Sequence, residues 1–281
     1  MITALDHVVL VCPDLSDGVD TYRTLLGYDP VWRSEGPGQG SALFALGNTA
    51  LELIAPAGSG PVAQRLRDMT KAGAVLTSLA YRSDDLDEDH RLLTRRGLAP
   101  LEMAAHTSQD IATHAQRQWR SFRIPDTKMA SIKSFVLQSD STLQTPDLSI
   151  DRSGVTSLDH LVIHTPNPDR TVATYGTRLD LRFALDRKAE QWNTRFLFFR
   201  LGGLTLEIIH RLDTEQDPDG PDSIWGITWA TPDLEAAHAR LRGAGITVSE
   251  LRTGRKPGSR VFTVKSGTLG IPTLFITHTR D

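Results

Sequence analysis

The chain has a single cysteine, Cys12, among its 281 residues. It therefore cannot form an internal disulfide, which fits a reducing, cytoplasmic setting. It also lacks an apolar run long enough to cross a membrane, since Asp6 and His7 interrupt the first apolar stretch. No basic segment precedes that stretch, so we expect no signal peptide.

A charge excess of either sign is also missing. The chain carries 31 Lys and Arg residues against 34 Asp and Glu residues, a formal net charge of −3, without long runs of one sign. This balance argues against a nucleic-acid or membrane partner. Hydrophobic residues make up 39% of the chain, which is ordinary for a globular protein long enough to hold two cores. A small molecule is the expected partner, and a homodimer is one assembly that the sequence leaves open.

What the sequence does contain is an internal repeat. The segment "LDHVVLVCPDLSDGVDTYRTLLGYDPVW" (5–32) aligns without a gap with "LDHLVIHTPNPDRTVATYGTRLDLRFAL" (158–185), which pairs His7 with His160. Further on, "LELI" (51–54) matches "LEII" (206–209), which pairs Glu52 with Glu207. Each half therefore has a histidine in an early apolar strand and a glutamate in a later one.

Each half also divides into two similar units. "LTSLAYRSDDLDEDHRLLTRRGLAP" (76–100) and "IWGITWATPDLEAAHARLRGAGITV" (224–248) both run from an apolar strand through an Asp-Leu turn into a helix that ends near glycine. The pattern predicts an α+β fold of four βαβββ modules that pair into two cupped mixed sheets. The expected units are 3–55, 75–138, 156–211 and 223–278, which gives an N-terminal domain 1–138, a polar linker 139–155 and a C-terminal domain 156–281.

This layout resembles the vicinal oxygen chelate superfamily, which includes glyoxalase I, extradiol dioxygenases and the bleomycin and fosfomycin resistance proteins. The resemblance is carried by "LDHVVLVCPDL", "LELI", "SLAYRSDDLD", "LDHLVI", "LTLEII" and "ITWATPDLEAAHARLRGAGI" and covers nearly the whole chain. It implies paired βαβββ modules with a divalent metal inside the cup, such as Zn, Mn, Fe(II) or Ni. The metal would be held by a first-strand His and a last-strand Glu from each of two units. Nothing indicates a nucleotide cofactor.

Carried over to this sequence, the resemblance implies His7 and Glu52 as metal ligands in one half and His160 and Glu207 in the other. The partner units depart from the pattern, because Ser78, Gly226 and Leu274 stand where further ligands are expected, and "SIKSFVLQ" (131–138) offers no carboxylate. Each cup keeps half a ligand set. His164 is the best additional ligand, because it shares the strand parity of His160. Without a metal, the His–Glu pairs would contact a ligand or act as acid and base.

Other residues are candidates for substrate binding. The loop and strand "ELRTGRKPGSRVFTV" (250–264) contains Lys256 and Arg260, and Arg260 at the strand entrance is the expected anion clamp. The segment "RQWRSFRIP" (117–125) occupies a similar place in the second unit. Aromatic side chains could form a flat wall. The expected substrate-binding residues are Arg260, Lys256, Trp192, Trp225 and Trp229.

Two functions remain in competition at this stage. The first is a metal-assisted lyase or isomerase acting on a small, anionic molecule with vicinal oxygens, in which Glu207 and Glu52 are the catalytic residues. The second is a metal-free binding protein similar to the bleomycin resistance proteins. An extradiol dioxygenase is less favoured, because the fourth unit lacks the His and Glu it would use. We expect the C-terminal half to be the working cup, since it carries the basic loop and the tryptophans.

Overall fold

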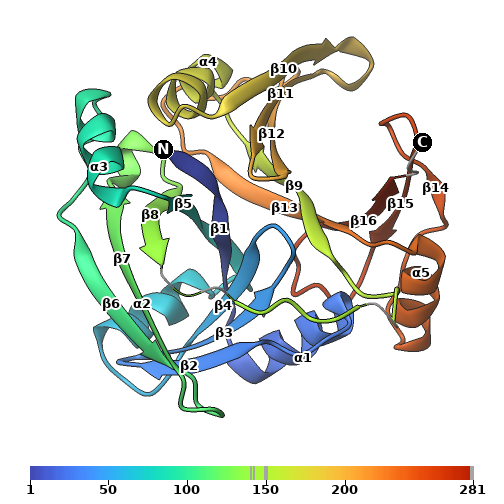
Figure 1. Cartoon of the computed structure of the whole chain (residues 1–281). Coiled ribbons are helices and arrows are strands. Elements are labelled where there is room, and N and C mark those ends of the chain that lie inside the picture. Colours follow the sequence, from blue (N-terminus) through green and yellow to red (C-terminus); the bar gives the residue numbers. More distant parts are fainter. Residues whose placement is uncertain (140, 142, 149–150, 279–281) are drawn as a thin grey trace.

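Two eight-stranded mixed sheets, one from each half of the chain, make up the fold (Figure 1). The structure is a computed structural model that describes residues 1–139, 141, 143–148 and 151–278. The expected linker (139–155) therefore falls partly outside the described residues. The α+β class and the four βαβββ modules predicted from the sequence are confirmed, because each sheet combines the strands of two modules around a central antiparallel pair.

The strand order is the same in both sheets. It reads β2-β3-β4-β1-β5-β8-β7-β6 in the first and β10-β11-β12-β9-β13-β16-β15-β14 in the second. The strands of the first sheet are β1 (Ile2–Val11), β2 (Trp32–Gly36), β3 (Gln39–Ala45), β4 (Ala50–Pro56), β5 (Val75–Ser83), β6 (Ala104–Gln109), β7 (Gln116–Ile124) and β8 (Lys133–Ser139). Those of the second are β9 (Ser157–His164), β10 (Arg182–Ala189), β11 (Thr194–Leu201), β12 (Leu204–Arg211), β13 (Ser223–Ala230), β14 (Arg252–Thr253), β15 (Ser259–Val264) and β16 (Thr273–His278).

Each module's helix starts at an Asp or Asn whose side chain accepts a hydrogen bond from a backbone N–H three residues later. This satisfies a donor that the first turn leaves free, and it explains the Asp-Leu turns seen in the sequence. The four capping residues are Asp14, Asp85, Asn167 and Asp233. The helices are α1 (Leu15–Leu26), α3 (Leu86–Arg95), α4 (Pro168–Thr171) with its wider continuation η2 (Val172–Arg178), and α5 (Leu234–Gly243), while short turns η1 (Asp126–Lys128) and η3 (Glu190–Trp192) lie in loops.

One apolar core joins the two halves. Its buried residues come from both sheets and from helices of both halves. Hydrogen bonds also link the helices across the halves, from α5 to the end of α1 and from the end of α3 to the end of η2 (Figure 1). Arg240 of α5 donates hydrogen bonds to the backbone oxygens of Thr24 and Leu25 at the end of α1. Arg96, just after α3, bonds the backbone oxygen of Arg178 and pairs with Asp180. The concave face of each sheet points away from this core.

The chain also ties its halves together through Asn48, in the turn between β3 and β4. The amide of Asn48 donates to the backbone oxygen of Leu158 (2.8 Å) and accepts from the backbone N–H of Leu158 (3.0 Å). These bonds satisfy the backbone N–H and C=O groups of Leu158, which is fully buried.

We expect Asn48→Ala to lower the free energy of unfolding by about 1–3 kcal/mol, because it leaves the two buried backbone groups of Leu158 without partners. The measurement is urea denaturation followed by circular dichroism. Gln64→Ala, which removes only an exposed contact with Asp68, is the matched control and should stay within about 0.5 kcal/mol of the wild type. Equal stability of the two variants would contradict the role of Asn48.

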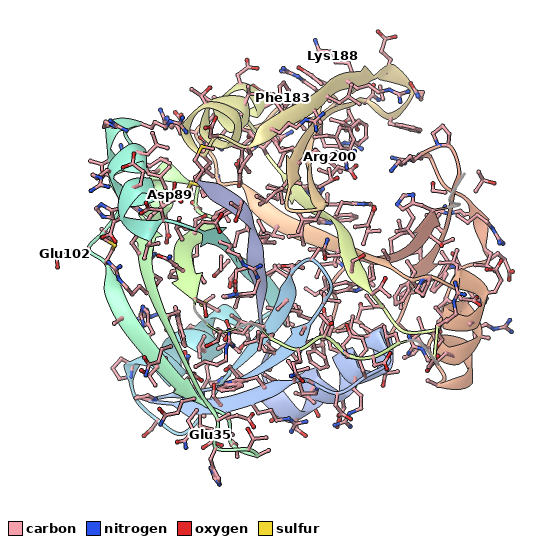
Figure 2. The ribbon with its side chains drawn as sticks, viewed as in Figure 1. Glu35, Asp89, Glu102, Phe183, Lys188 and Arg200 are labelled. Atoms are coloured by element: carbon pink, nitrogen blue, oxygen red, sulfur yellow. The ribbon has the colours of Figure 1, made fainter. Side chains whose placement is uncertain are left out.

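The N-terminal sheet closes almost into a barrel, because its edge strands β2 and β6 meet. The carboxylate of Asp110 accepts a hydrogen bond from the backbone N–H of Arg33 (2.8 Å), and Trp32 Nε1 donates to Ser108 Oγ (3.0 Å). In the C-terminal sheet the edge strand β10 is exposed along nearly its whole length, and Phe183 and Lys188 can be located on it in Figure 2. The second cup is therefore the more open one.

We expect the barrel closure to depend on pH through Asp110. The hydrogen bond from the Arg33 backbone lowers the pKa of Asp110, and further bonds from Thr113 act in the same direction. A carboxylate whose pKa is lowered by folding stabilises the protein above its unfolded pKa, and this contribution disappears as the pH falls through the folded pKa. We expect Asp110→Asn to melt at a lower temperature than the wild type at pH 7 and at the same temperature near pH 2. A constant difference across that range would contradict this assignment.

An additional helix lies in the N-terminal half, where the sequence predicted no element. Helix α2 (Pro61–Met69) begins with proline and places Leu66 on Val9 and Val11, on the concave face of the sheet. Leu143 packs on Trp32 and Leu43 of the same concave face. The N-terminal cup is thus partly filled by its own chain, whereas the segment between β12 and β13 forms a loop. None of the helices within the described residues is long and apolar enough to cross a membrane.

Candidate functional site

The His–Glu pair of each cup is created by the register of two parallel strands. In the N-terminal half, Val9 of β1 pairs with Glu52 of β4. Since side chains alternate along a strand, His7 and Glu52 lie on the same face. In the C-terminal half, Val162 of β9 pairs with Glu207 of β12 in the same way. The four residues that the resemblance singled out are therefore brought together two by two, inside separate cups.

The two pairs have matching geometry. Nε2 of His7 lies 3.4 Å from Oε2 of Glu52, and Nε2 of His160 lies 3.4 Å from Oε2 of Glu207. The side chains of the second pair are 19% and 17% exposed. This leaves both groups within reach of a ligand that enters the cup, while their surroundings are mostly shielded from water.

The strands opposite each pair add no further metal ligand. By the same register rule, Ser78 of β5 and Phe135 of β8 occupy the equivalent positions in the N-terminal cup. In the C-terminal cup these positions are held by Gly226 and Leu274. Among the residues that the structure describes, no three His, Cys, Asp or Glu side chains are grouped closely enough to hold an ion. One imidazole and one carboxylate do not fit a metal held by protein ligands alone, which usually number three or four.

His164 does not complete the set. It stands at the end of β9, where it stacks on Trp225 with ring centroids 5.0 Å apart. Burial lowers the pKa of His164, and the charge of Arg211 acts in the same direction. A depression of about 360 Å³ opens beside it, between the end of β9 and the loop that follows β12. His164 and Trp225 thus form an aromatic surface at one end of the cup.

The N-terminal pair is biased toward a charged imidazole. Nδ1 of His7 lies 2.9 Å from Asp6, which is also paired with Arg82. Burial alone would lower the pKa of His7, but the hydrogen bond with Asp6 and the charge of Glu52 outweigh it, so that the pKa is raised. The interactions of Asp6 with His7 and Arg82 likewise outweigh burial and lower the pKa of Asp6.

The C-terminal pair is biased toward a protonated carboxyl group instead. Burial raises the pKa of Glu207, and the charges of His160 and Arg255 only partly oppose it. His160 also shares a hydrogen bond of 2.8 Å with the hydroxyl of Thr228. The adjacent Asp159 is held by His278 at 3.1 Å. A carboxyl group with a raised pKa, next to an imidazole, is suited to exchanging a proton with a bound ligand.

The cation over this pair is Arg255, which the sequence analysis did not single out. The guanidinium of Arg255 lies over the ring of Trp192, 4.0 Å from its centroid. This contact joins the tip of the β10–β11 hairpin to the loop before β15, and so bridges the mouth of the cup. Trp192 therefore lies at the predicted site. Arg200 of β11 adds a second cation on the concave face, where it bonds Thr205 Oγ1 at 2.6 Å (Figure 2).

Two of the predicted substrate-binding residues, Arg260 and Trp229, do not face the cup, and a third, Lys256, is exposed to solvent. Arg260 is on the opposite face of β15 from Thr263 and pairs with Glu235 of α5, so it does not face the cup. Trp229 is fully buried in the core between the sheets. Lys256 is exposed in the turn before β15. The parity of β15, counted from Thr263, was the signal that could have argued against Arg260.

The paired βαβββ architecture, with a His–Glu pair in each cup, defines a class of protein in which two similar halves each enclose a potential small-molecule site. The glyoxalase-like domain model matches residues 5–175, and a model of the glyoxalase, bleomycin resistance protein and dioxygenase superfamily matches residues 159–263. The chain therefore belongs to this superfamily, the vicinal oxygen chelate proteins. None of the curated proteins compared with it matches the sequence.

Solved structures with the same fold are distant in sequence. A mutant of 4-hydroxymandelate synthase from Streptomyces coelicolor is 13% identical over 100% of this chain and 95% of its own, with a TM-score of 0.72. A Mn(II)-bound glyoxalase from Novosphingobium aromaticivorans is 15% identical over 98% of this chain and 82% of its own, with a TM-score of 0.67. A hypothetical protein from Staphylococcus aureus reaches a TM-score of 0.64 at 10% identity, over 97% and 98% of the two chains. At these identities the likeness concerns the fold.

Proposed function

We propose that the chain is a lyase or isomerase that moves a proton on a small anionic molecule with adjacent oxygen atoms, and that its C-terminal cup is the active site. The observation that carries this proposal is the half-buried Glu207 with its raised pKa, in contact with His160 and close to the charge of Arg255. The openness of this cup supports the choice, since helix α2 and Leu143 fill part of the other one.

Each side chain has a distinct task in this proposal. Arg255, held flat by Trp192, binds the carboxylate of the substrate. Glu207 takes the proton from the carbon next to a carbonyl group, and its raised pKa makes it a stronger base than an ordinary glutamate. His160, positioned by the Thr228 hydroxyl, donates a hydrogen bond to the oxygen on which negative charge develops.

The C-terminal cup supplies only part of the ligand set that the metal implied by the resemblance requires. The Mn(II)-bound glyoxalase is a structural neighbour that carries a divalent ion, and His160 with Glu207 supplies two suitable donors. Gly226 and Leu274 supply none. We expect elemental analysis of protein purified without a metal-affinity column to find far less than one equivalent of Zn, Mn, Fe or Ni. A near-stoichiometric metal that Glu207→Gln removes would contradict the donor argument.

The proposal can be tested without knowing the physiological substrate. A panel of short 2-oxo and 2-hydroxy carboxylates is incubated with the protein in D₂O, and the signal of the proton beside the carbonyl or hydroxyl carbon is followed by ¹H NMR. We expect enzyme-dependent loss of this signal for at least one compound, and the loss should persist in Glu52→Gln.

The alternative is a metal-free binding protein, which the missing donors Gly226 and Leu274 favour. Under that alternative, compounds bind with saturation, but no proton exchanges above the background rate. Saturable binding without exchange over the whole panel would overturn the enzymatic proposal and support sequestration.

A further inference from the structure

Arg117 is the feature of the N-terminal cup that the proposed function does not use. It lies on β7, paired with Ser108 of β6, and therefore on the concave face of the sheet, with Ser121 and Trp119. Its guanidinium carbon lies 5.4 Å from the centroid of the Trp32 ring. The closure of the barrel brings β2, which carries Trp32, close to β6 and β7. Arg117 therefore faces the same interior as His7 and Glu52.

Arg117 makes no hydrogen bond or ion pair within the described part of the chain. In the part of the chain that the structure describes, four arginines have a buried Nε atom without a hydrogen-bond partner: Arg117, Arg123, Arg170 and Arg240. Three of them are bonded through their other nitrogens, Arg123 to Asp126, Arg170 to Asp222 and Arg240 to the backbone of α1. For Arg117 the interaction found within the described residues is the one with the Trp32 ring. Its neighbour Arg120 points to the other face of β7 and forms two bonds with Asp87.

The carboxylates of this cup are already paired with basic side chains other than Arg117. Asp6 is paired with Arg82 and with His7, and Glu52 contacts His7. Burial lowers the pKa of Arg117, and the charges of Asp6 and Glu52 offset this only in part. A guanidinium that is partly removed from water without an anion in contact is unfavourable, and a bound carboxylate would relieve this cost.

The same arrangement appears in the C-terminal cup, built from different positions. There Arg255 lies over Trp192 beside Glu207. The gap-free alignment that pairs Tyr22 with Tyr175 places Leu185, not Trp192, opposite Trp32. The Arg–Trp contact is therefore not a relic of the duplication. It arises separately in each cup, next to the His–Glu pair.

We propose that the N-terminal cup is a second binding site, which takes a small carboxylate between the Arg117 guanidinium, the Trp32 ring and the His7–Glu52 pair. Arginine binds a carboxylate through two parallel N–H donors. The ring of Trp32 holds the guanidinium plane in place, and the bond to Ser108 fixes that ring. The ligand is small, because Leu66 and Leu143 occupy part of the concave face.

The experiment uses the indole N–H groups as reporters. The chain has five tryptophans, so ¹H–¹⁵N spectra of tryptophan-labelled protein contain few indole signals, which Trp→Phe variants assign. Oxalate and pyruvate are the probes. Trp32 reports on the N-terminal cup and Trp192 on the C-terminal cup. We expect a saturable shift of the Trp32 signal with a millimolar or lower dissociation constant. Arg117→Gln should weaken this binding at least tenfold, and Arg117→Lys should weaken it less.

Two controls separate this inference from the proposed function. Arg120→Gln removes a neighbouring arginine from the opposite face of β7 and should leave the Trp32 titration unchanged. Glu207→Gln should likewise leave it unchanged, even if it abolishes proton exchange. A Trp32 signal that does not move, or that moves equally in wild type and Arg117→Gln with unchanged melting temperature, overturns the second site. A shift of Trp192 alone also overturns it and leaves the C-terminal cup as the anion site.

Discussion

Replacing Trp229 by alanine is expected to lower the free energy of unfolding by about 3–5 kcal/mol, the usual cost of deleting a large aromatic side chain from a core. Trp229 is among the largest fully buried side chains of the protein, and it belongs to the core that both sheets share. Its indole nitrogen has no hydrogen-bond partner among the residues described at 1–139, 141, 143–148 and 151–278, so the loss is one of packing. The measurement is guanidinium denaturation followed by far-ultraviolet circular dichroism.

Trp225→Ala is the control on the same strand. Trp225 is 47% exposed and contacts His164 on the concave face. It should therefore cost less than about 1 kcal/mol, as most substitutions away from a core do. Trp229→Phe, which keeps most of the apolar volume, should fall between the two alanine variants. If Trp229→Ala were no more costly than Trp225→Ala, the assignment of Trp229 to the core would be wrong.

Glu207→Gln is expected to reduce proton exchange about 10²–10⁴-fold, the usual contribution of a general base. Glu52→Gln, which makes the matching change in the other cup, should reduce it less than threefold. Since burial raises the pKa of Glu207, the rate should rise with pH to a plateau reached above the ordinary titration range of a glutamate. A rate that is independent of pH from 4 to 8 would contradict Glu207 as the base.

The raised pKa of Glu207 also predicts that replacing this residue stabilises the fold, although it reduces proton exchange. A carboxyl group whose pKa is higher in the folded than in the unfolded protein destabilises the fold once the pH exceeds the unfolded pKa. Glu207→Gln should therefore melt at a higher temperature than the wild type at pH 7, and at a similar temperature at pH 3. This gain in stability, together with a loss of exchange, would distinguish a functional carboxylate from a structural one.

The sequence predicted the fold and half of the site for a clear physical reason. The repeat aligned His7 with His160 and Glu52 with Glu207, and a parallel strand pair with fixed register then places each histidine beside its glutamate. The same logic identified Ser78, Gly226 and Leu274 as the opposite positions. These predictions depend only on strand order and alternation, which the apolar pattern encodes directly.

The predicted site residues that do not face the cup lie in two kinds of place. In one, the alternation of side chains along a strand is interrupted. In the other, the sequence did not show which residues of the strand face the cup. Trp225 and Trp229 are four residues apart, and both were expected to bind the substrate. The register of β13 shifts between Ile224 and Gly226, so that Trp225 turns toward His164 while Trp229 enters the core. A bulge of this kind leaves no trace in the apolar pattern. Arg260 was placed in the cup because the phase of β15 was not considered.

The contacts that complete each cup could not be predicted from the sequence either. The Arg–Trp contacts join hairpins and strands that are distant along the chain, so neither Arg117 with Trp32 nor Arg255 with Trp192 could be read from spacing. Helix α2 fills one cup from a segment that carries no repeat signal. Such differences depend on how the edges of each sheet meet in three dimensions.

The open C-terminal cup has a consequence for the behaviour of the protein in solution. Its access is possible because β10 remains an edge strand, and an exposed edge offers unpaired backbone groups to any other strand that approaches. The sequence of β10, "RFALDRKA", counters this by placing Arg182, Asp186, Arg187 and Lys188 along it. A second chain that paired with this edge would bring its own copies of these charges alongside. Colloidal stability at high concentration is thus tied to the charges on β10, and neutralising them would favour sheet-to-sheet association.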